Sequence, residues 1–168
     1  MKEIDSMEMN EKLIKETVKE GGVLALVYFD VHGTDKEKIR EFSTGFIKGM
    51  LSEPGIVYVV GEIDEPIQNK DVVSTAIEVR VLAKSMPALV RFVARYSPFS
   101  VEILEPEEIR MSMADAHDLL MSVSTMMFDH KKYILERVAK KEDVERIKTE
   151  LENRIKLGRM LLEKSRKK

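Results

Sequence analysis

The order of apolar and polar residues at the start of the chain predicts a short helix followed by a buried strand. Residues 6–20 place apolar side chains three and four positions apart, which is the spacing of one helix face. Gly21 and Gly22 then favour the left-handed backbone that ends many helices. Residues 23–31 are almost continuously apolar and rich in β-branched and aromatic side chains, which predicts a central buried strand.

A second helix and a second strand are predicted next. Thr34 and Glu37 have the spacing of a capping box, so Thr34 is expected to cap the helix. Apolar residues recur along this helix at three- and four-residue intervals, at Ile39, Phe42, Phe46, Ile47 and Met50. Pro54 and Gly55 are expected to end the helix, and residues 56–63 have the composition of a strand.

The following segment predicts a strand, a helix and a last strand. Residues 69–71 resemble a hairpin turn, and the strand over 72–83 alternates apolar and polar side chains. This alternation indicates either a half-exposed sheet face or an edge strand. Ser85 is expected to cap a helix that ends at Ser97-Pro98, and residues 99–104 alternate again as a strand.

Between residues 23 and 104 the predicted order is therefore strand, helix, strand, strand, helix, strand. Right-handed connections fold this order into one antiparallel sheet with both helices on one face, the ferredoxin-like βαββαβ sandwich. We predict an α+β fold with an N-terminal helix over residues 1–22, a ferredoxin-like domain over residues 23–110 and a helical extension over residues 111–168.

The extension is expected to contain two long amphipathic helices. The first covers residues 112–138, and a polar break over residues 140–143 precedes the second. The apolar stripe of the second helix consists of Ile147, Leu151, Ile155, Gly158 and Leu162. Such stripes are buried either in an antiparallel helical hairpin or in a coiled coil with another subunit. We therefore expect a homo-oligomer, with a dimer favoured.

Composition narrows the class of protein. Cysteine is absent, which excludes disulfides, thiolate nucleophiles and thiolate metal sites. No run of about 18 apolar residues is present, so a membrane-spanning helix is not expected. The acidic N-terminus lacks the apolar core of a secretion signal, which predicts a cytoplasmic protein. One glutamine and three asparagines, together with abundant Glu, Lys and Arg, are typical of a thermophile.

Charge is distributed unevenly along the chain. Residues 131–168 carry fourteen Lys or Arg against seven Asp or Glu, and residues 1–130 carry fourteen against twenty-three. The two segments therefore have net charges of +7 and −9. Two interpretations remain open: the basic segment binds an anionic partner such as nucleic acid, or it docks against an acidic body in the same or a neighbouring subunit. The basic C-terminal residues that could contact phosphates are Lys164, Arg166, Lys167 and Lys168.

A candidate ligand site lies where the first strand meets the next helix. Asp30 and His32 are two residues apart on a strand and therefore point to the same side. The following helix start offers free N–H groups to a carboxylate or phosphate, and Gly33 permits close backbone approach. The predicted ligand-binding residues are Asp30, His32, Gly33, Thr34 and Asp35. The structural alternative is a capped turn in which Asp35 only complements the helix dipole.

Evidence for an enzyme is slight. A metal-dependent enzyme would use His117, Asp118 and His130, and the two histidines lie thirteen positions apart without the spacing of known zinc motifs. Phosphate loops, dinucleotide fingerprints and serine nucleophile elbows are also missing from the sequence. We therefore predict no catalytic residue, no metal ligand and no cofactor.

Three segments resemble parts of small regulatory or ferredoxin-like domains. Residues 29–34, with sequence FDVHGT, resemble the strand-to-helix start of ACT domains, with His32 where that family usually has proline. Residues 52–64 are similar to the second strand of the Lrp/AsnC effector module, and residues 101–110 look like the close of WYL-associated ferredoxin-like domains. The resemblance covers residues 23–110 and implies a dimerising ferredoxin-like sandwich that binds an amino acid or similar effector at residues 30–34. Those families carry no such helical tail, and the N-terminal segment is too short for a helix-turn-helix, which argues against DNA-binding regulation.

Three functional hypotheses follow. The first is a non-enzymatic, oligomeric regulatory module that binds a small anionic metabolite. The second is an interaction protein whose basic C-terminal helices hold nucleic acid or an acidic protein. The third is a carboxylate- or histidine-based metal-dependent enzyme.

Overall fold

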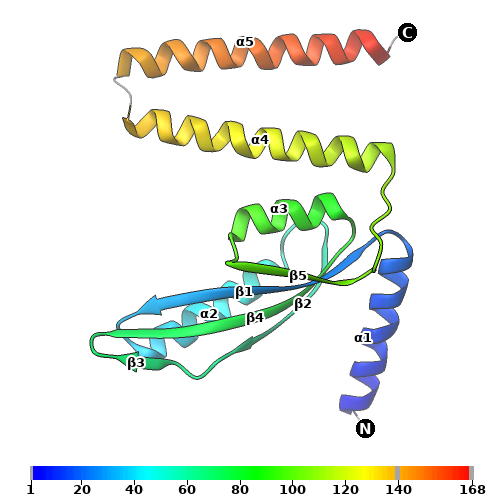
Figure 1. The fold of residues 1–168 in the computed structure, drawn as a ribbon, viewed down its shortest axis with the longest axis vertical. Coiled ribbons are helices and arrows are strands. Elements are labelled where there is room, and N and C mark those ends of the chain that lie inside the picture. The colour runs from blue at the N-terminus through cyan, green and yellow to red at the C-terminus, as the bar shows by residue number, and fades with distance from the viewer. Residues whose placement is uncertain (1, 139–140, 167–168) are drawn as a thin grey trace. The chain divides into compact units, whose positions relative to one another are not determined.

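The computed structural model describes residues 2–138 and 141–166 (Figure 1). Within these ranges the side chains of residues 2–10, 141, 142, 144, 151, 158, 159 and 161–166 are not described. The elements in chain order are α1 (Lys2–Lys19), β1 (Val23–Gly33), α2 (Lys36–Met50), β2 (Ile56–Ile63), β3 (Ile67–Asn69), β4 (Val72–Ala83), α3 (Met86–Tyr96), β5 (Ser100–Glu105), α4 (Met113–Val138) and α5 (Lys141–Arg166). The predicted α+β class is confirmed. The chain forms two compact units, residues 1–122 and residues 123–168.

The first unit is built on one antiparallel sheet, as predicted. Its strand order is β2-β4-β1-β5, and the three-residue β3 also pairs with β4. In the register, Val27 of β1 lies opposite Val79 of β4 on one side and Val101 of β5 on the other. Because β4 pairs with both β1 and β2, it is not an edge strand, and of the two expected alternatives its alternation reflects the half-exposed sheet face.

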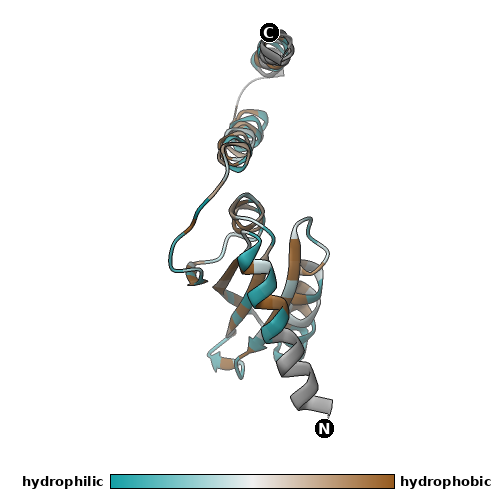
Figure 2. Cartoon of the chain, turned by 90° about the vertical axis from the view of Figure 1, so that its right-hand side faces the viewer, coloured by the Kyte–Doolittle hydropathy of each residue, from teal (hydrophilic) through white to brown (hydrophobic). Residues whose placement is uncertain are grey.

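One face of the sheet carries the core. Alternate residues of β1 and β4 pack there against α2 and α3, and the buried cluster consists of Val23, Ala25, Val27, Phe29, Met50, Ile56, Ile77, Val79, Val81, Ala83, Ala88, Leu89 and Phe92. An aromatic group extends it, since the Phe46 ring lies 5.1 Å from Phe29 and 5.4 Å from Tyr96 between centroids. In Figure 2 the strands show long brown stretches, in keeping with this core.

The opposite face of the sheet, which we call the open face, is largely exposed. Strand alternation assigns to it Leu26, Tyr28, Asp30, Tyr58, Val60, Glu62, Glu78, Arg80, Ser100 and Glu102. Its end at the start of β1 is covered: Leu24 and Leu82 are buried there, and α1 contacts both β1 and β4. The Cβ that Gly22 lacks would lie 2.5 Å from Cγ2 of Thr17, so this glycine permits the close approach of α1.

Residues at the helix ends explain most helix boundaries, and one predicted helix cap is corrected. Gly21 adopts a left-handed φ of +98° after α1, and Ser85 caps α3 by accepting the N–H of Ala88, both as predicted. The prediction that Thr34 caps α2 is wrong. Asp35 is the cap, and its Oδ1 accepts the N–H of Lys38 at 2.9 Å.

The second unit consists of the end of α4 and the antiparallel α5 (Figure 1). Nζ of Lys148 lies 3.2 Å from Oε1 of Glu136, and a groove between the two helices is lined by Ser124, Met127, Phe128, Lys131, Arg154 and Ile155. The unit leaves many large apolar side chains exposed, namely Val123, Met127, Tyr133, Ile134, Val138, Ile155, Leu157 and Met160. Coiled-coil packing and pairing with another subunit stay predictions.

Candidate functional site

Four of the five predicted ligand-binding residues line one shallow hollow at the end of β1. It has a volume of about 300 Å³, and its walls are Val31, His32, Gly33, Thr34, Asp35, Lys38, Ile39 and Phe42. Asp30 is not part of this lining. Its exposed side chain lies on the open face, where it is paired in register with Ala76.

The chemistry of this hollow differs from the expectation of a free helix N-terminus. The carboxylate of Asp35 already accepts the N–H of Lys38, so a negative charge occupies the helix end that an anionic ligand would use. The missing Cβ of Gly33 would lie 3.1 Å from Cγ1 of Ile39, so this glycine admits the buried Ile39 side chain. His32 alternates with the core-packed Val31, so its side chain points to the same side as Asp30. An anion in the hollow would therefore depend on the side chain of Lys38, beside the apolar Ile39 and Phe42.

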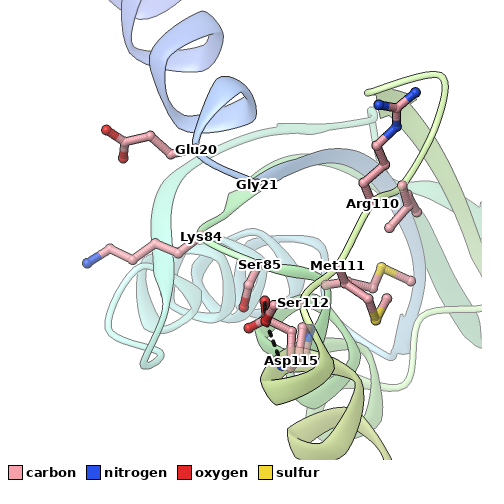
Figure 3. A pocket seen from close by; sticks show the side chains of 11 residues that line it. Glu20, Gly21, Lys84, Ser85, Arg110, Met111, Ser112 and Asp115 are labelled. Atoms are coloured by element: carbon pink, nitrogen blue, oxygen red, sulfur yellow. Dashed lines mark hydrogen bonds between the residues drawn. The ribbon is translucent and has the colours of Figure 1, made fainter.

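A second hollow was not predicted from the sequence (Figure 3). Its volume is about 280 Å³, and it is lined by Glu20, Gly21, Lys84, Ser85, Met86, Pro87, Ile109, Arg110, Met111, Ser112 and Asp115. Three segments far apart in the sequence form its walls, which is why no local motif revealed it. The only local signal is Ser112, whose Oγ accepts the N–H of Asp115 at 3.1 Å and donates to its Oδ2 at 2.7 Å.

The charges around this second hollow do not converge on one point. Figure 3 shows Lys84 and Arg110 on opposite sides, each directed away from Ser85 and Asp115. Nη2 of Arg110 lies 3.0 Å from Oε2 of Glu108. With two cations and two carboxylates in its lining, this hollow has no net preference for an anion.

The candidate metal ligands are not brought together. Oδ2 of Asp118 lies 2.8 Å from Nη1 of Arg91, which also donates to Oγ of Ser122 at 3.2 Å. Among the residues that the structure describes, no group of three His, Asp or Glu side chains could hold a metal ion. The hypothesis of a metal-dependent enzyme at His117, Asp118 and His130 therefore has no geometric support in this part of the chain.

The predicted phosphate-contacting residues lie outside the part of the chain whose side chains are described. Lys167 and Lys168 lie outside the described residues, and the side chains of Lys164 and Arg166 in α5 are not described. Their role in binding nucleic acid stays a prediction.

Two tyrosines have perturbed acidity. Burial and the hydrogen bond that Tyr96 donates to Oε1 of Glu53, at 3.0 Å, raise the pKa of Tyr96. Burial raises the pKa of Tyr28 as well, and the neighbouring charges of Glu78 and Glu102 raise it further. The part of the Tyr28 pKa shift that comes from the two glutamates indicates a negative potential on the open face.

In the described ranges no helix combines the length and hydrophobicity needed to span a bilayer.

No curated protein and no solved structure matches the chain significantly. The model of the MJ0538 family matches residues 24–158, which is more than half of the chain. The chain therefore belongs to the MJ0538 family.

Proposed function

We propose that this chain is a non-enzymatic module that self-associates through its C-terminal helices and, as a regulatory domain, binds a small anionic metabolite. The observation that carries the proposal is the exposed apolar surface of the second unit. Leu157 and Met160 are 57% and 55% exposed, and Val138 is 81% exposed. Apolar side chains gathered on one helical unit usually mark a protein interface, whereas single exposed ones need no explanation.

The free energy gained by burying the exposed apolar side chains favours association. Removing apolar surface from water contributes about 25 cal/mol per Å², and a large side chain buried fully contributes about 1.5–3 kcal/mol. The second unit exposes eight such side chains among those described. Burying part of this surface against a second copy offsets the entropic cost of association, which is why a dimer is the state we favour.

The assignment of the first unit to the ferredoxin-like fold is part of the same proposal. The strand order β2-β4-β1-β5, with α2 and α3 packed on one face, supports the ferredoxin-like sandwich. The motif resemblance over residues 23–110 implies a sandwich of this kind that dimerises, and it points the same way.

Self-association is tested by sedimentation velocity of the full chain and of a matched pair of variants. Leu157→Glu places a charge on the proposed interface, whereas Leu51→Glu places one on an equally exposed leucine of the first unit (57% and 54%). We expect Leu157→Glu to dissociate the oligomer and Leu51→Glu to leave it intact. A full chain that sediments as a monomer at every concentration would contradict the proposal.

The ligand hollow is the second element, and its lining favours a carboxylate that carries an apolar group. Lys38 supplies the cationic side, and Ile39 and Phe42 supply the apolar side. Native mass spectrometry of protein purified without added ligand, followed by calorimetric titration with amino acids, tests for such a ligand. Lys38→Glu is expected to abolish binding. Lys36→Glu, an exposed lysine in the same helix turn but outside the hollow, is expected to preserve it.

A further inference from the structure

The open face of the sheet presents an apolar centre surrounded by carboxylates. Leu26, Tyr28 and Val60 lie on it, and Val60 is 45% exposed. Its acidic residues are Asp30, Glu62, Glu78 and Glu102, against the single cation Arg80. Within the described ranges none of these four carboxylates forms a salt bridge, and together with Arg80 they give the face a net negative charge.

One pair on this face is unfavourable for the fold. Glu62 of β2 lies directly opposite Glu78 of β4 in the register. Like charges at directly opposed positions destabilise a sheet. The cost is similar in size to the gain from a favourable cross-strand pair, which is about 0.2–1 kcal/mol. A cationic partner bound across the face would remove this repulsion. The pair therefore indicates a surface suited to a basic ligand.

The most basic segment of the sequence matches that surface. Residues 154–168 carry seven Lys or Arg against one Glu, a net charge of +6. The same segment contributes the exposed Leu157 and Met160. The thirteen residues from Arg154 to Arg166, where α5 ends, extend about 20 Å along the helix axis. Four neighbouring strands span about 15 Å between the outer strand axes, so a helix of this length covers the width of the sheet.

The same charges argue against the simplest alternative arrangement. If two copies paired through their open faces, eight carboxylates would be brought together against two arginines. Such like-charge contacts oppose association and suppress the wrong pairing. A duplex or single-stranded nucleic acid on the open face is disfavoured for the same reason, because its phosphates are negative.

We propose that the open face is the docking surface for the basic C-terminal half of α5 from a second copy of this chain, with the contact repeated reciprocally in a closed dimer. This inference rests on the proposed self-association and names what the C-terminal helix contacts. Lys156 faces the carboxylates of Glu62 and Glu78, while Leu157 and Met160, which lie on the same side of the helix as Lys156, cover Leu26, Tyr28 and Val60.

Charge reversal with rescue tests this contact in the full-length chain. The face variant Glu62→Lys/Glu78→Lys keeps a like-charge pair within the sheet, so the internal electrostatics of the fold change little. The helix variant is Lys156→Glu. At low salt we expect each to raise the dimer dissociation constant, measured by sedimentation equilibrium, at least about tenfold. The two combined are expected to return it to within about threefold of the parent value, since opposite charges again meet.

The control and the contrary outcomes separate this inference from the proposed function. Glu37→Lys/Glu41→Lys reverses two exposed charges of α2 and should leave the dimer unchanged. If the face variant dimerises as the parent does while Leu157→Glu dissociates it, the docking surface is refuted and self-association stands. A monomeric parent chain refutes both. If the helix variant loses only oligonucleotide binding and dimerises normally, the basic segment serves nucleic acid and the docking surface is again refuted.

Discussion

Replacing Gly55 with alanine tests how the connection after α2 is fitted against α3. Gly55 has φ of +86°, a left-handed conformation that costs a residue with a Cβ about 1–2 kcal/mol. The new Cβ would lie 2.8 Å from the Cβ of Ala88, which is almost fully buried. The carbonyl of Gly55 accepts the N–H of Lys84 at 2.8 Å. The turn is therefore fixed by this hydrogen bond on one side and bounded by Ala88 on the other. Overpacking of such a site costs about 1–3 kcal/mol.

Together these terms predict a loss of about 2–5 kcal/mol for Gly55→Ala. The matched control is Gly45→Ala within α2, because nothing lies within 4 Å of its added Cβ. Alanine is the better helix former, and this change is expected to stabilise the chain by about 0.5–1 kcal/mol. Urea denaturation followed by circular dichroism at 222 nm measures the unfolding free energy of both variants. A Gly55→Ala chain as stable as the parent, or a Gly45→Ala chain less stable, would refute the reasoning.

Three further predictions concern side chains that the structure places in defined environments. Ser43 is fully buried in α2 and its Oγ has no hydrogen-bond partner among the described residues, so Ser43→Ala is expected to raise the unfolding free energy by about 1 kcal/mol in urea titrations. The raised pKa of Tyr96, above its ordinary value of 10.0, means that the folded chain holds the phenolic proton more tightly than the unfolded chain. Its contribution to stability is full below pH 10 and falls as the pH rises beyond it, and melting temperatures of Tyr96→Phe should fall less steeply there. Arg91→Ala removes an exposed ion pair with Asp118 and should cost less than about 1 kcal/mol globally, yet increase amide exchange in residues 113–122; unchanged exchange would contradict this role.

Local chemistry explains why several elements agree with the sequence predictions. The strands over 56–63 and 72–83 begin and end where predicted, because turn-forming residues flank both. Lys70 adopts φ of 55° in the hairpin turn, and Ser85 caps the next helix through its own side chain. These signals lie within a few residues of the boundary they determine.

The miss at the start of α2 has a long-range cause. Thr34 and Asp35 are both good capping residues, and the sequence alone does not choose between them. Gly33 pairs with Val73 in the sheet, so β1 continues two residues beyond its predicted end at residue 31. The helix consequently begins at Lys36, and the capping role passes to Asp35. The strand β3 was missed because its three residues form only by pairing with β4.

The candidate site was predicted only in part for the same reason. Four of the five proposed residues are neighbours in sequence, and their meeting in one hollow follows from the turn that contains them. The hollow beside Ser85 and Ser112 requires the chain to bring residues 20, 84 and 110 together. No periodicity or spacing encodes that meeting, because it depends on where the segment after β5 crosses the end of the sheet.

The position of β5 has a consequence for aggregation. As the last strand in the sheet order, β5 has an outer edge whose backbone groups are unpaired within the described sheet, and its Val101 and Ile103 are each 40% exposed. An edge of this kind can template the addition of a strand from another molecule. Glu102 and Glu105 interrupt the apolar residues and act as charged gatekeepers. Removing both charges, as in Glu102→Gln/Glu105→Gln, would therefore convert a protected edge into a site of intermolecular strand pairing and fibril growth.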